Sequence, residues 1–191
     1  MTHTFDTGTF KEVMPLILEY HYARRRCADP AAVFVVRRED YSPVACAVFA
    51  APINRYFGRH AVELVRLVRL PEYEAPLSAF ISWCLKRLKA TRDFYYVLSY
   101  ADTDAAHHGG IYQACSFAYL GQSKGHTMYR NAEGKITSAR SRDQSSTAAQ
   151  RKLFPFKTGP KHLYVRGLHI STTDAVARLG RQALPYPKPM L

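Results

Sequence analysis

The sequence predicts an α/β fold, in which one domain holds a mixed, mostly antiparallel sheet with helices on both faces. Short apolar runs of strand length alternate along the chain with segments whose apolar residues recur every three or four positions, which is helical spacing. Two of the apolar runs are joined by Arg-Arg-Glu-Asp-Tyr-Ser-Pro, a turn-forming stretch that favours an antiparallel hairpin. With 191 residues, 47% of them hydrophobic, the chain can bury one substantial core.

The elements follow from these periodicities in chain order. Thr9 is expected to cap a helix whose apolar face runs from Phe10 to Leu18 and ends on His21. The further expected elements are a hairpin over 31–36 and 44–50, a strand over 60–70, a helix over 77–88, a strand over 94–98, a helix from Tyr112 to about residue 118, a hairpin over 125–130 and 135–139, a polar helix over 143–153 and a strand over 162–167. Residues 1–168 would form the domain, and 169–191, rich in proline, an irregular C-terminal tail.

Charge is the strongest compositional feature. The chain carries 27 lysines and arginines against 15 acidic residues, a net charge of +12, and residues 135–191 alone carry +9. This asymmetry predicts that the protein binds a polyanionic partner. The alternative is that the basic residues only keep the protein well solvated. The residues expected to contact a nucleic-acid backbone are Lys135, Arg140, Arg142, Arg151, Lys152, Lys157 and Lys161.

The cysteines and the N-terminal residues indicate the cellular compartment in which the protein is expected. Cys27, Cys46, Cys84 and Cys115 lie in apolar segments without CxxC spacing, so they are expected to be reduced core residues rather than disulfides or zinc ligands. The first residues lack the build of a signal peptide, and no apolar stretch approaches the ~20 residues of a membrane span. We therefore expect a cytoplasmic protein without a membrane partner.

A dense polar cluster follows the 94–98 run. Asp102, Asp104, His107 and His108 come where a strand should end, and open α/β sheets bind ligands beyond the carboxyl ends of their strands. Gly109-Gly110 then leads into the predicted helix, whose free N–H groups would point at the cluster. Tyr100, His107, His108, Gly109 and Gly110 are the candidate substrate-binding residues. A capped surface loop is the alternative interpretation.

Two more polar positions stand out in apolar surroundings. His21 lies on the apolar face of the first helix, where a hydrogen-bonded packing role is the alternative to ligand binding. Arg66 and Arg69 are three residues apart on a predicted strand, so they lie on opposite faces and only one is expected to face a site.

Residues 111–121, Ile-Tyr-Gln-Ala-Cys-Ser-Phe-Ala-Tyr-Leu-Gly, resemble the fourth-helix motif of the GNAT N-acetyltransferase superfamily, with Ser116 in place of the usual glycine. This resemblance implies a GNAT-like sheet. Those enzymes hold coenzyme A phosphates on a glycine-rich loop, but residues 69–80 here contain no glycine, two prolines and two glutamates. Weak binding of acetyl-CoA is expected.

A second resemblance covers most of the chain. The stretches LVRLVRL (64–70), SYADTDAAHHGGIYQACSF (99–117), EGKITSARS (133–141) and KHLYVRGL (161–168) resemble the Mom family of Mu-like phages, a GNAT-like branch that modifies DNA adenine at N6 and shields phage DNA from host restriction. By this resemblance the catalytic residues are His21, Tyr22, Arg66, Asp102 and Tyr112, with Ser99 opening the Ser-Tyr-Ala-Asp motif. Iron is associated with the family, which makes His21 and Asp102 candidate iron(II) ligands.

The resemblance also implies the reaction. The family's product is a carbamoylmethyl group on N6, which is isomeric with a glycyl group, so glycyl-tRNA is a chemically admissible donor. Adenine N6 must lose a proton as it reacts, and Asp102 is the candidate base, with Arg66 and Tyr112 positioning the donor. The partners would be double-stranded DNA and tRNA in the host cytoplasm, and a homodimer is compatible with the sequence.

A base in duplex DNA must leave the stack to react, and Tyr56, Phe57 or Tyr100 could stack on it. Two other function classes stay open: an acetyl-CoA-dependent N-acetyltransferase, and a nucleic-acid-binding protein without enzymatic activity on the same scaffold.

Overall fold

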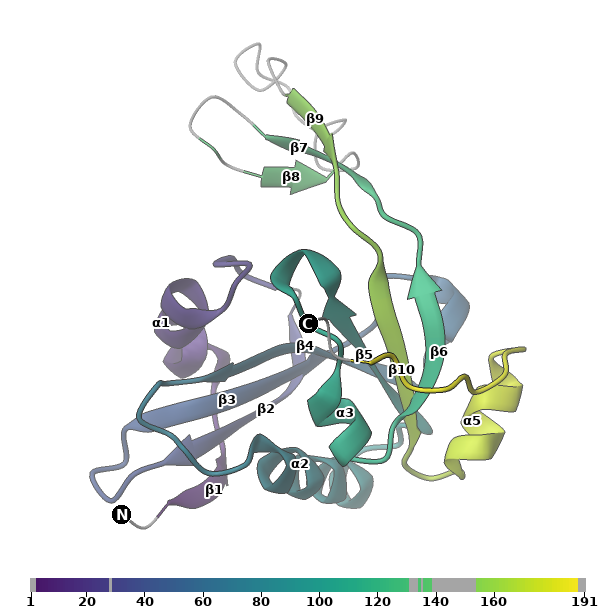
Figure 1. Ribbon diagram of the computed structural model, residues 1–191. Helices are drawn as coiled ribbons and strands as arrows, with labels where there is room; N and C mark the ends of the chain where they lie inside the picture. The colour runs from purple at the N-terminus through teal and green to yellow at the C-terminus, as the bar shows by residue number, and fades with distance from the viewer. Residues whose placement is uncertain (1–2, 28, 131–133, 135, 139–153, 189–191) are drawn as a thin grey trace.

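A seven-stranded sheet forms the body of the protein in the computed structural model, which describes residues 3–27, 29–130, 134, 136–138 and 154–188 (Figure 1). The strand order is β1-β2-β3-β4-β5-β10-β6. The strands are β1 (Thr4–Thr7), β2 (Pro30–Arg37), β3 (Pro43–Ala50), β4 (Ala61–Arg69), β5 (Tyr96–Asp102), β6 (Ala118–Ser123) and β10 (Lys161–Gly167). The β4–β5 pair is parallel and the other pairs are antiparallel, which confirms the expected mixed sheet.

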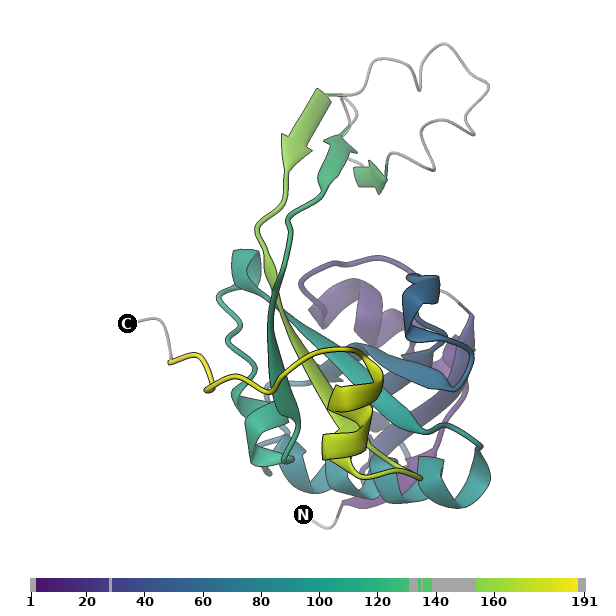
Figure 2. The same cartoon turned by 90° about the vertical axis from the view of Figure 1, so that its right-hand side faces the viewer.

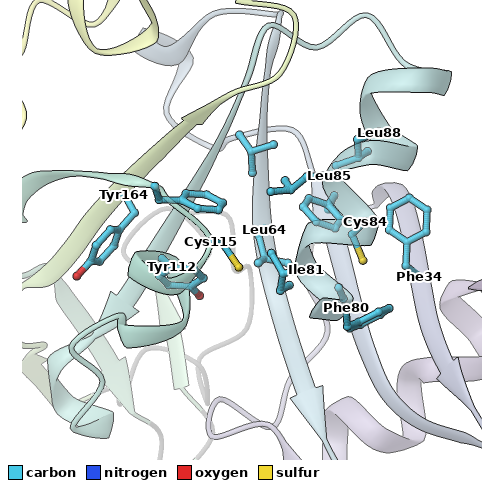
Figure 3. Close-up of a cluster of buried hydrophobic side chains, with 14 of the residues drawn as sticks. Phe34, Leu64, Phe80, Ile81, Cys84, Leu85, Leu88, Tyr112, Cys115 and Tyr164 are labelled. Atoms are coloured by element: carbon cyan, nitrogen blue, oxygen red, sulfur yellow. The ribbon is translucent and has the colours of Figure 1, made fainter. Parts of the chain in front are cut away.

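Helices cover both faces of this sheet (Figures 1 and 2). They are α1 (Phe10–Tyr20), α2 (Leu77–Thr91), the short α3 (Gly110–Ala114) and α5 (Thr172–Arg178). Buried residues of α2 and α3 pack on one face, where Figure 3 shows Ile81 of α2 beside Leu64 of β4. Side chains of α1 and α5 pack on the other face in two further clusters. The alternation of side chains along each strand produces this division.

The first helix begins where its cap predicts. Thr9 Oγ1 accepts the Glu12 N–H at 3.2 Å, and Glu12 Oε2 accepts the Thr9 N–H at 3.3 Å, so the two residues form a capping box. Val13 and Ile17 are fully buried against the sheet. Arg37 of β2 pairs with Glu12 and with Asp6, which ties α1 to the sheet edge.

The parallel strands β4 and β5 separate toward their carboxyl ends. Their pairing runs from Ala61 opposite Tyr96 to Leu64 opposite Ser99, and β4 then continues to Arg69 while β5 continues to Asp102. A register shift between Val48 and Phe49 of β3 accompanies the bend in β4. The diverging strand ends leave space at the edge of the sheet where the polar cluster was predicted.

A second, three-stranded sheet projects away from the body (Figures 1 and 2). Its strands β7 (Thr127–Arg130), β8 (Ile136–Ser138) and β9 (Phe154–Lys157) are antiparallel in the order β8-β7-β9. The β7–β8 pair confirms the hairpin predicted over 125–139 within the described residues. The polar helix predicted over 143–153 lies outside the described residues.

Three sequence expectations differ from the structure. Strand β5 does not break after Leu98 but continues to Asp102, because Ser99 and Ala101 pack into the buried sheet as apolar residues would. The helix expected from Tyr112 to residue 118 ends at Ala114, since Ser116 has a φ of +57° and the chain then enters β6. The C-terminal segment contains helix α5, whose Ala175 and Val176 are buried, so it is not irregular throughout.

Within the described residues, no helix combines the length and apolar character that crossing a membrane requires.

Candidate active site

A cavity of about 680 Å³ occupies the space between the diverging ends of β4 and β5. The α1 terminus, the start of α2 and the loop before α3 complete its wall. Its lining includes Tyr20, His21, Tyr22, Leu64, Arg69, Leu77, Ser78, Tyr100, His107, His108, Gly109, Gly110 and Tyr112. Residues from four segments that are far apart in the sequence therefore meet at the strand end where a polar cluster was predicted.

His21 and Tyr22 enter the cavity from the end of α1. His21 is 7% exposed, and its Nδ1 accepts the Ala23 N–H at 3.0 Å, so this nitrogen is unprotonated. Burial, reinforced by the charge of Arg66, lowers the pKa of His21 to about 4. The Tyr22 ring stacks on His21 with centroids 4.4 Å apart, and His107 meets it edge-on at 5.4 Å. His21 is thus a neutral, fixed support for Tyr22.

Tyr22 points its hydroxyl toward the strand-end carboxylate. Burial of the hydroxyl end raises the pKa of Tyr22 strongly, and the charge of Asp102 and hydrogen bonding to it raise that pKa further. Tyr22 as a whole is 49% exposed, and it lines the cavity. Tyr22 therefore stays protonated and can donate a hydrogen bond.

Asp102 forms an ion pair beside the cavity, whose lining includes the preceding residue Ala101. Its Oδ2 lies 2.7 Å from Lys161 Nζ, and its Oδ1 accepts the Asp104 N–H at 3.1 Å. Asp102 is 7% exposed and ends β5, where the antiparallel register sets it directly opposite Lys161 of β10. Lys161, expected from charge alone to contact a nucleic-acid backbone, instead places its ammonium on this carboxylate.

Glu63 is a second carboxylate, which the sequence reasoning did not select. In the parallel register it pairs with Leu98, so it shares a sheet face with Tyr100 and Asp102. Burial raises the pKa of Glu63 to about 7, although the charges of Lys161 and Arg66 oppose the rise. The charge of Glu63 in turn adds to burial in raising the pKa of Tyr100 to about 12. Glu63 is the one acidic residue of β4, among apolar residues and two arginines, and that was the signal that could have found it.

The two strand arginines take different places. Arg69 lines the cavity. Arg66 donates from Nη1 to the Val65 carbonyl at 2.6 Å and from Nη2 to the Arg25 carbonyl at 3.2 Å. Its Nε is buried and has no hydrogen-bond partner within the described residues. Burial lowers the pKa of Arg66, and the nearby Tyr22 and Glu63 side chains oppose part of that decrease.

Ser99 and Tyr112 lie on the opposite sheet face from Asp102. Both are buried, and Ser99 Oγ donates to the Leu64 carbonyl at 3.4 Å where β4 and β5 begin to separate. Burial raises the pKa of Tyr112, and hydrogen bonding to Ser99 opposes part of that rise. Tyr112 reaches the cavity, so residues of both faces contribute to one site.

The Gly109-Gly110 pair has a packing role. Gly109 adopts a φ of +82°, and a Cβ there would lie 2.3 Å from Tyr164 Cε2. The loop can therefore lie on the Tyr164 ring, whose hydroxyl donates to the His108 carbonyl at 2.5 Å. This contact places His107 and His108 on the cavity wall.

The residues suggested for iron are engaged in other contacts. His21 uses Nδ1 for the Ala23 N–H, and both oxygens of Asp102 are engaged by Lys161 and by the Asp104 N–H. Within the part of the chain that the structure describes, no group of three or more His, Cys, Asp or Glu side chains could hold a metal ion. An iron site made by His21 and Asp102 therefore stays a prediction.

The remaining residues that were predicted to contact nucleic acid belong to different parts of the chain. Lys157 is exposed on β9, whereas Lys135, Arg140, Arg142, Arg151 and Lys152 lie outside the described residues. Phe57 is 5% exposed and belongs to the core, and the Tyr56 hydroxyl donates to the Leu179 carbonyl at 2.5 Å. Of the three aromatic residues considered for base stacking, Tyr100 is the one that lines the cavity.

Residues 3–188 match the Mom protein family. The chain belongs to this family. No curated protein matches the sequence of this Mom-family protein.

Solved structures show where the Mom-family fold belongs. The ribosomal-protein-S18-alanine N-acetyltransferase of Escherichia coli is similar with a TM-score of 0.55 and 9% identity, over 89% of this chain and 96% of that one. The GNAT phosphinothricin acetyltransferase of Sinorhizobium meliloti, in complex with AcCoA, has a TM-score of 0.53 and 16% identity over 91% and 92%. The IAA acetyltransferase of Bacillus cereus has a TM-score of 0.56 and 9% identity over 87% and 100%. The Mom-family protein therefore has a GNAT fold.

Proposed function

We propose that this Mom-family protein is a DNA-modifying transferase that adds a glycyl-derived group of the carbamoylmethyl type to N6 of adenine and so protects phage DNA from restriction. The family match over residues 3–188 carries this choice of substrate. The cavity between β4 and β5, with one carboxylate at its edge and tyrosine hydroxyls on its wall, supports the chemistry.

The proton released by the nucleophile needs an acceptor. The N6 lone pair is delocalised into the adenine ring, so N6 attacks well only when a base takes its proton as the new bond forms. Asp102 is the proposed base. The carboxylate is engaged by Lys161, by the Asp104 N–H and by Tyr22, and its two oxygens offer about four lone-pair sites, so one site is left to receive the N6 proton while Lys161 stays in place.

The donor is an activated glycyl ester such as glycyl-tRNA. N6 attacks the ester carbonyl carbon, a C–N bond forms, the C–O bond of the ester breaks, and the departing oxygen takes a proton from Lys161. Asp102 then returns its proton to Lys161. The resulting glycyl amide contains the same atoms as a carbamoylmethylamine, so the family's product requires a subsequent rearrangement without further reactants.

The tyrosines and Arg66 have supporting roles in this proposal. Because its pKa is raised, Tyr112 remains neutral and can donate a hydrogen bond to the carbonyl oxygen on which negative charge develops. Tyr22 directs its single O–H to Asp102 and so orients the proposed base. Arg66 is a positioning residue, since its guanidinium is held by two backbone carbonyls beside Tyr22 rather than exposed in the cavity.

Mass spectrometry of nucleosides tests the assignment. DNA from cells that express the protein is digested, and the adenine nucleosides are compared with those from cells that express Asp102→Asn. We expect an adenine derivative heavier by one glycyl unit with the unaltered protein, and far less with the variant. Unmodified adenine in both samples would reject the function.

An acetyl-CoA-dependent N-acetyltransferase is the second candidate, favoured by the GNAT fold and by a cavity that reaches Leu77 and Ser78 at the start of α2. The segment before α2 argues against it. Pro71 and Pro76 supply no N–H groups there, and Glu72 and Glu74 disfavour phosphate. A binding protein without activity would instead hold DNA and leave its nucleosides unchanged.

A further inference from the structure

The projecting sheet forms an arm that starts beside the active site. We define the arm as residues 124–160, between β6 and β10, of which 124–130, 134, 136–138 and 154–160 are described. In Figures 1 and 2 it extends from the sheet edge at which β5 ends and β10 begins. Since extended chain rises about 3.4 Å per residue, the run from Ser123 to Arg130 spans roughly 24 Å.

The arm is strongly basic. Its sequence holds eight lysines and arginines and two acidic residues. Among its described residues, Lys124, Arg130 and Lys157 are exposed and no side chain is acidic. Arg130 lies over the Phe156 ring at 5.2 Å, and its strand partner Phe154 is 65% exposed. The arm therefore presents cations together with an exposed aromatic ring.

The root of the arm is bonded to the loop that follows Asp102. Thr103 Oγ1 donates to the Pro160 carbonyl at 2.6 Å, and the Gly159 N–H donates to Asp104 Oδ2 at 2.8 Å. The next residue is Lys161, whose N–H donates to Ser123 Oγ at 3.2 Å and whose ammonium pairs with Asp102. These contacts orient the arm relative to the cavity, so a ligand held by the arm is also placed at the site.

We propose that the arm is a clamp for duplex DNA, which lies along the double helix beside the target adenine and presents that base to the cavity. The exposed cations Lys124, Arg130 and Lys157, on or beside β7 and β9, contact phosphates along the double helix. A span of roughly 24 Å covers about seven base-pair steps, enough to hold both sides of one extruded base. The inference rests on the proposed function, because it takes DNA as the substrate.

The salt dependence of DNA binding tests the clamp. The variant Lys124→Gln, Arg130→Gln, Lys157→Gln removes three exposed arm cations. For a duplex ligand, the slope of log affinity against log salt should become shallower by about 2–3, because each lost phosphate contact accounts for about 0.9. The matched control, Lys11→Gln, Lys86→Gln, Lys89→Gln, removes equal charge from exposed positions on α1 and α2 and should change the slope by less than about 1. An unchanged slope in the arm variant, or equal changes in both variants, overturns the proposal.

A truncation separates the clamp from catalysis. The Thr158 N–H donates to the His126 carbonyl at 2.9 Å, so an Asn-Gly turn can join His126 to Thr158 in place of residues 127–157. The root contacts of Gly159, Pro160 and Lys161 are kept. We expect affinity for a duplex to fall at least about tenfold, while modification of adenine in a short single strand persists.

The outcomes distinguish the two proposals. If the truncated protein binds and modifies duplex DNA as the full chain does, the clamp is rejected and the function stands. If the full chain modifies no adenine yet the arm variant alone loses duplex binding, the function fails together with the presentation of adenine to the cavity, and the arm stands only as a duplex-binding element. Equal loss of binding to tRNA and duplex, or dissociation of a dimer of the full chain, would show that the arm serves another partner and would reject the clamp. Should the truncated chain not fold, the charge variant decides.

Discussion

Lys161 Nζ lies 2.7 Å from Asp102 Oδ2, and the two residues stand directly opposite each other in the β10–β5 register. This pair joins the strand that carries the proposed base to the strand on which the arm ends. Its position explains why a residue with an ordinary surface sequence context belongs to the active site.

The Asp102→Asn variant should lose activity and keep DNA binding. Asparagine preserves shape and one acceptor oxygen but cannot take the N6 proton, so the modification rate should fall by about 10²–10⁴-fold. Nucleoside mass spectrometry and a duplex-binding titration measure the two quantities. Asp104→Asn is the matched control, because its amide oxygen can still accept the Gly159 N–H. A normal rate in Asp102→Asn would remove Asp102 from the base role.

Glu63 should make stability depend on pH. Its pKa is about 7 in the folded protein, above the ordinary carboxyl value of 4.5, so the folded state holds the proton more tightly than the unfolded state. Stability should therefore be highest below pH 4.5 for this group and decrease as the pH rises toward 7. Glu63→Gln should raise the free energy of unfolding by about 3 kcal/mol at pH 8 relative to its effect at pH 4.5.

Urea denaturation at pH 4.5, 7 and 8 measures that difference. The other titrating groups are shared by both proteins, so the change from the unaltered protein to Glu63→Gln isolates Glu63. A difference that stays constant with pH would mean that the Glu63 carboxyl is not held neutral by burial.

Gly109→Ala should destabilise the protein more than Gly58→Ala. Both glycines have positive φ, +82° and +74°, so both substitutions incur backbone strain of about 1–2 kcal/mol. A methyl group at Gly109 also collides with the Tyr164 ring, whereas at Gly58 it meets no described atom within 4 Å. Thermal unfolding should show the larger decrease for Gly109→Ala. Equal decreases would mean that the loop moves off Tyr164 without cost.

Acetyl-CoA should bind weakly. The segment before α2 contains no glycine, and Pro76 stands at the N-cap, so few backbone N–H groups can approach a pyrophosphate. Glu72 is partly neutralised by Arg38, which lies at 2.5 Å, so Glu72→Gln should improve binding only slightly. Isothermal titration measures both proteins. Micromolar affinity for the unaltered protein would favour the acetyltransferase alternative.

The sequence alone determined most of the local structure. The Thr9 cap, the 31–50 hairpin, the α2 helix and the 125–139 hairpin follow from turn residues and periodicity, because those signals act over a few neighbouring residues. Family motifs also named His21, Tyr22 and Tyr112, which the structure brings to one cavity. Strand β6 was missed, because its apolar residues also fit helical spacing.

Tertiary structure alone decided which distant side chains meet. Lys161 and Asp102 are far apart in the chain and pair only through the β10–β5 register, and Glu63 reaches the same face only through the parallel β4–β5 register. Arg69 rather than Arg66 lines the cavity, and the two arginines pair with Ala45 and Val48 of β3. Such registers depend on how whole strands pack against each other. A pattern of neighbouring residues does not predict that packing.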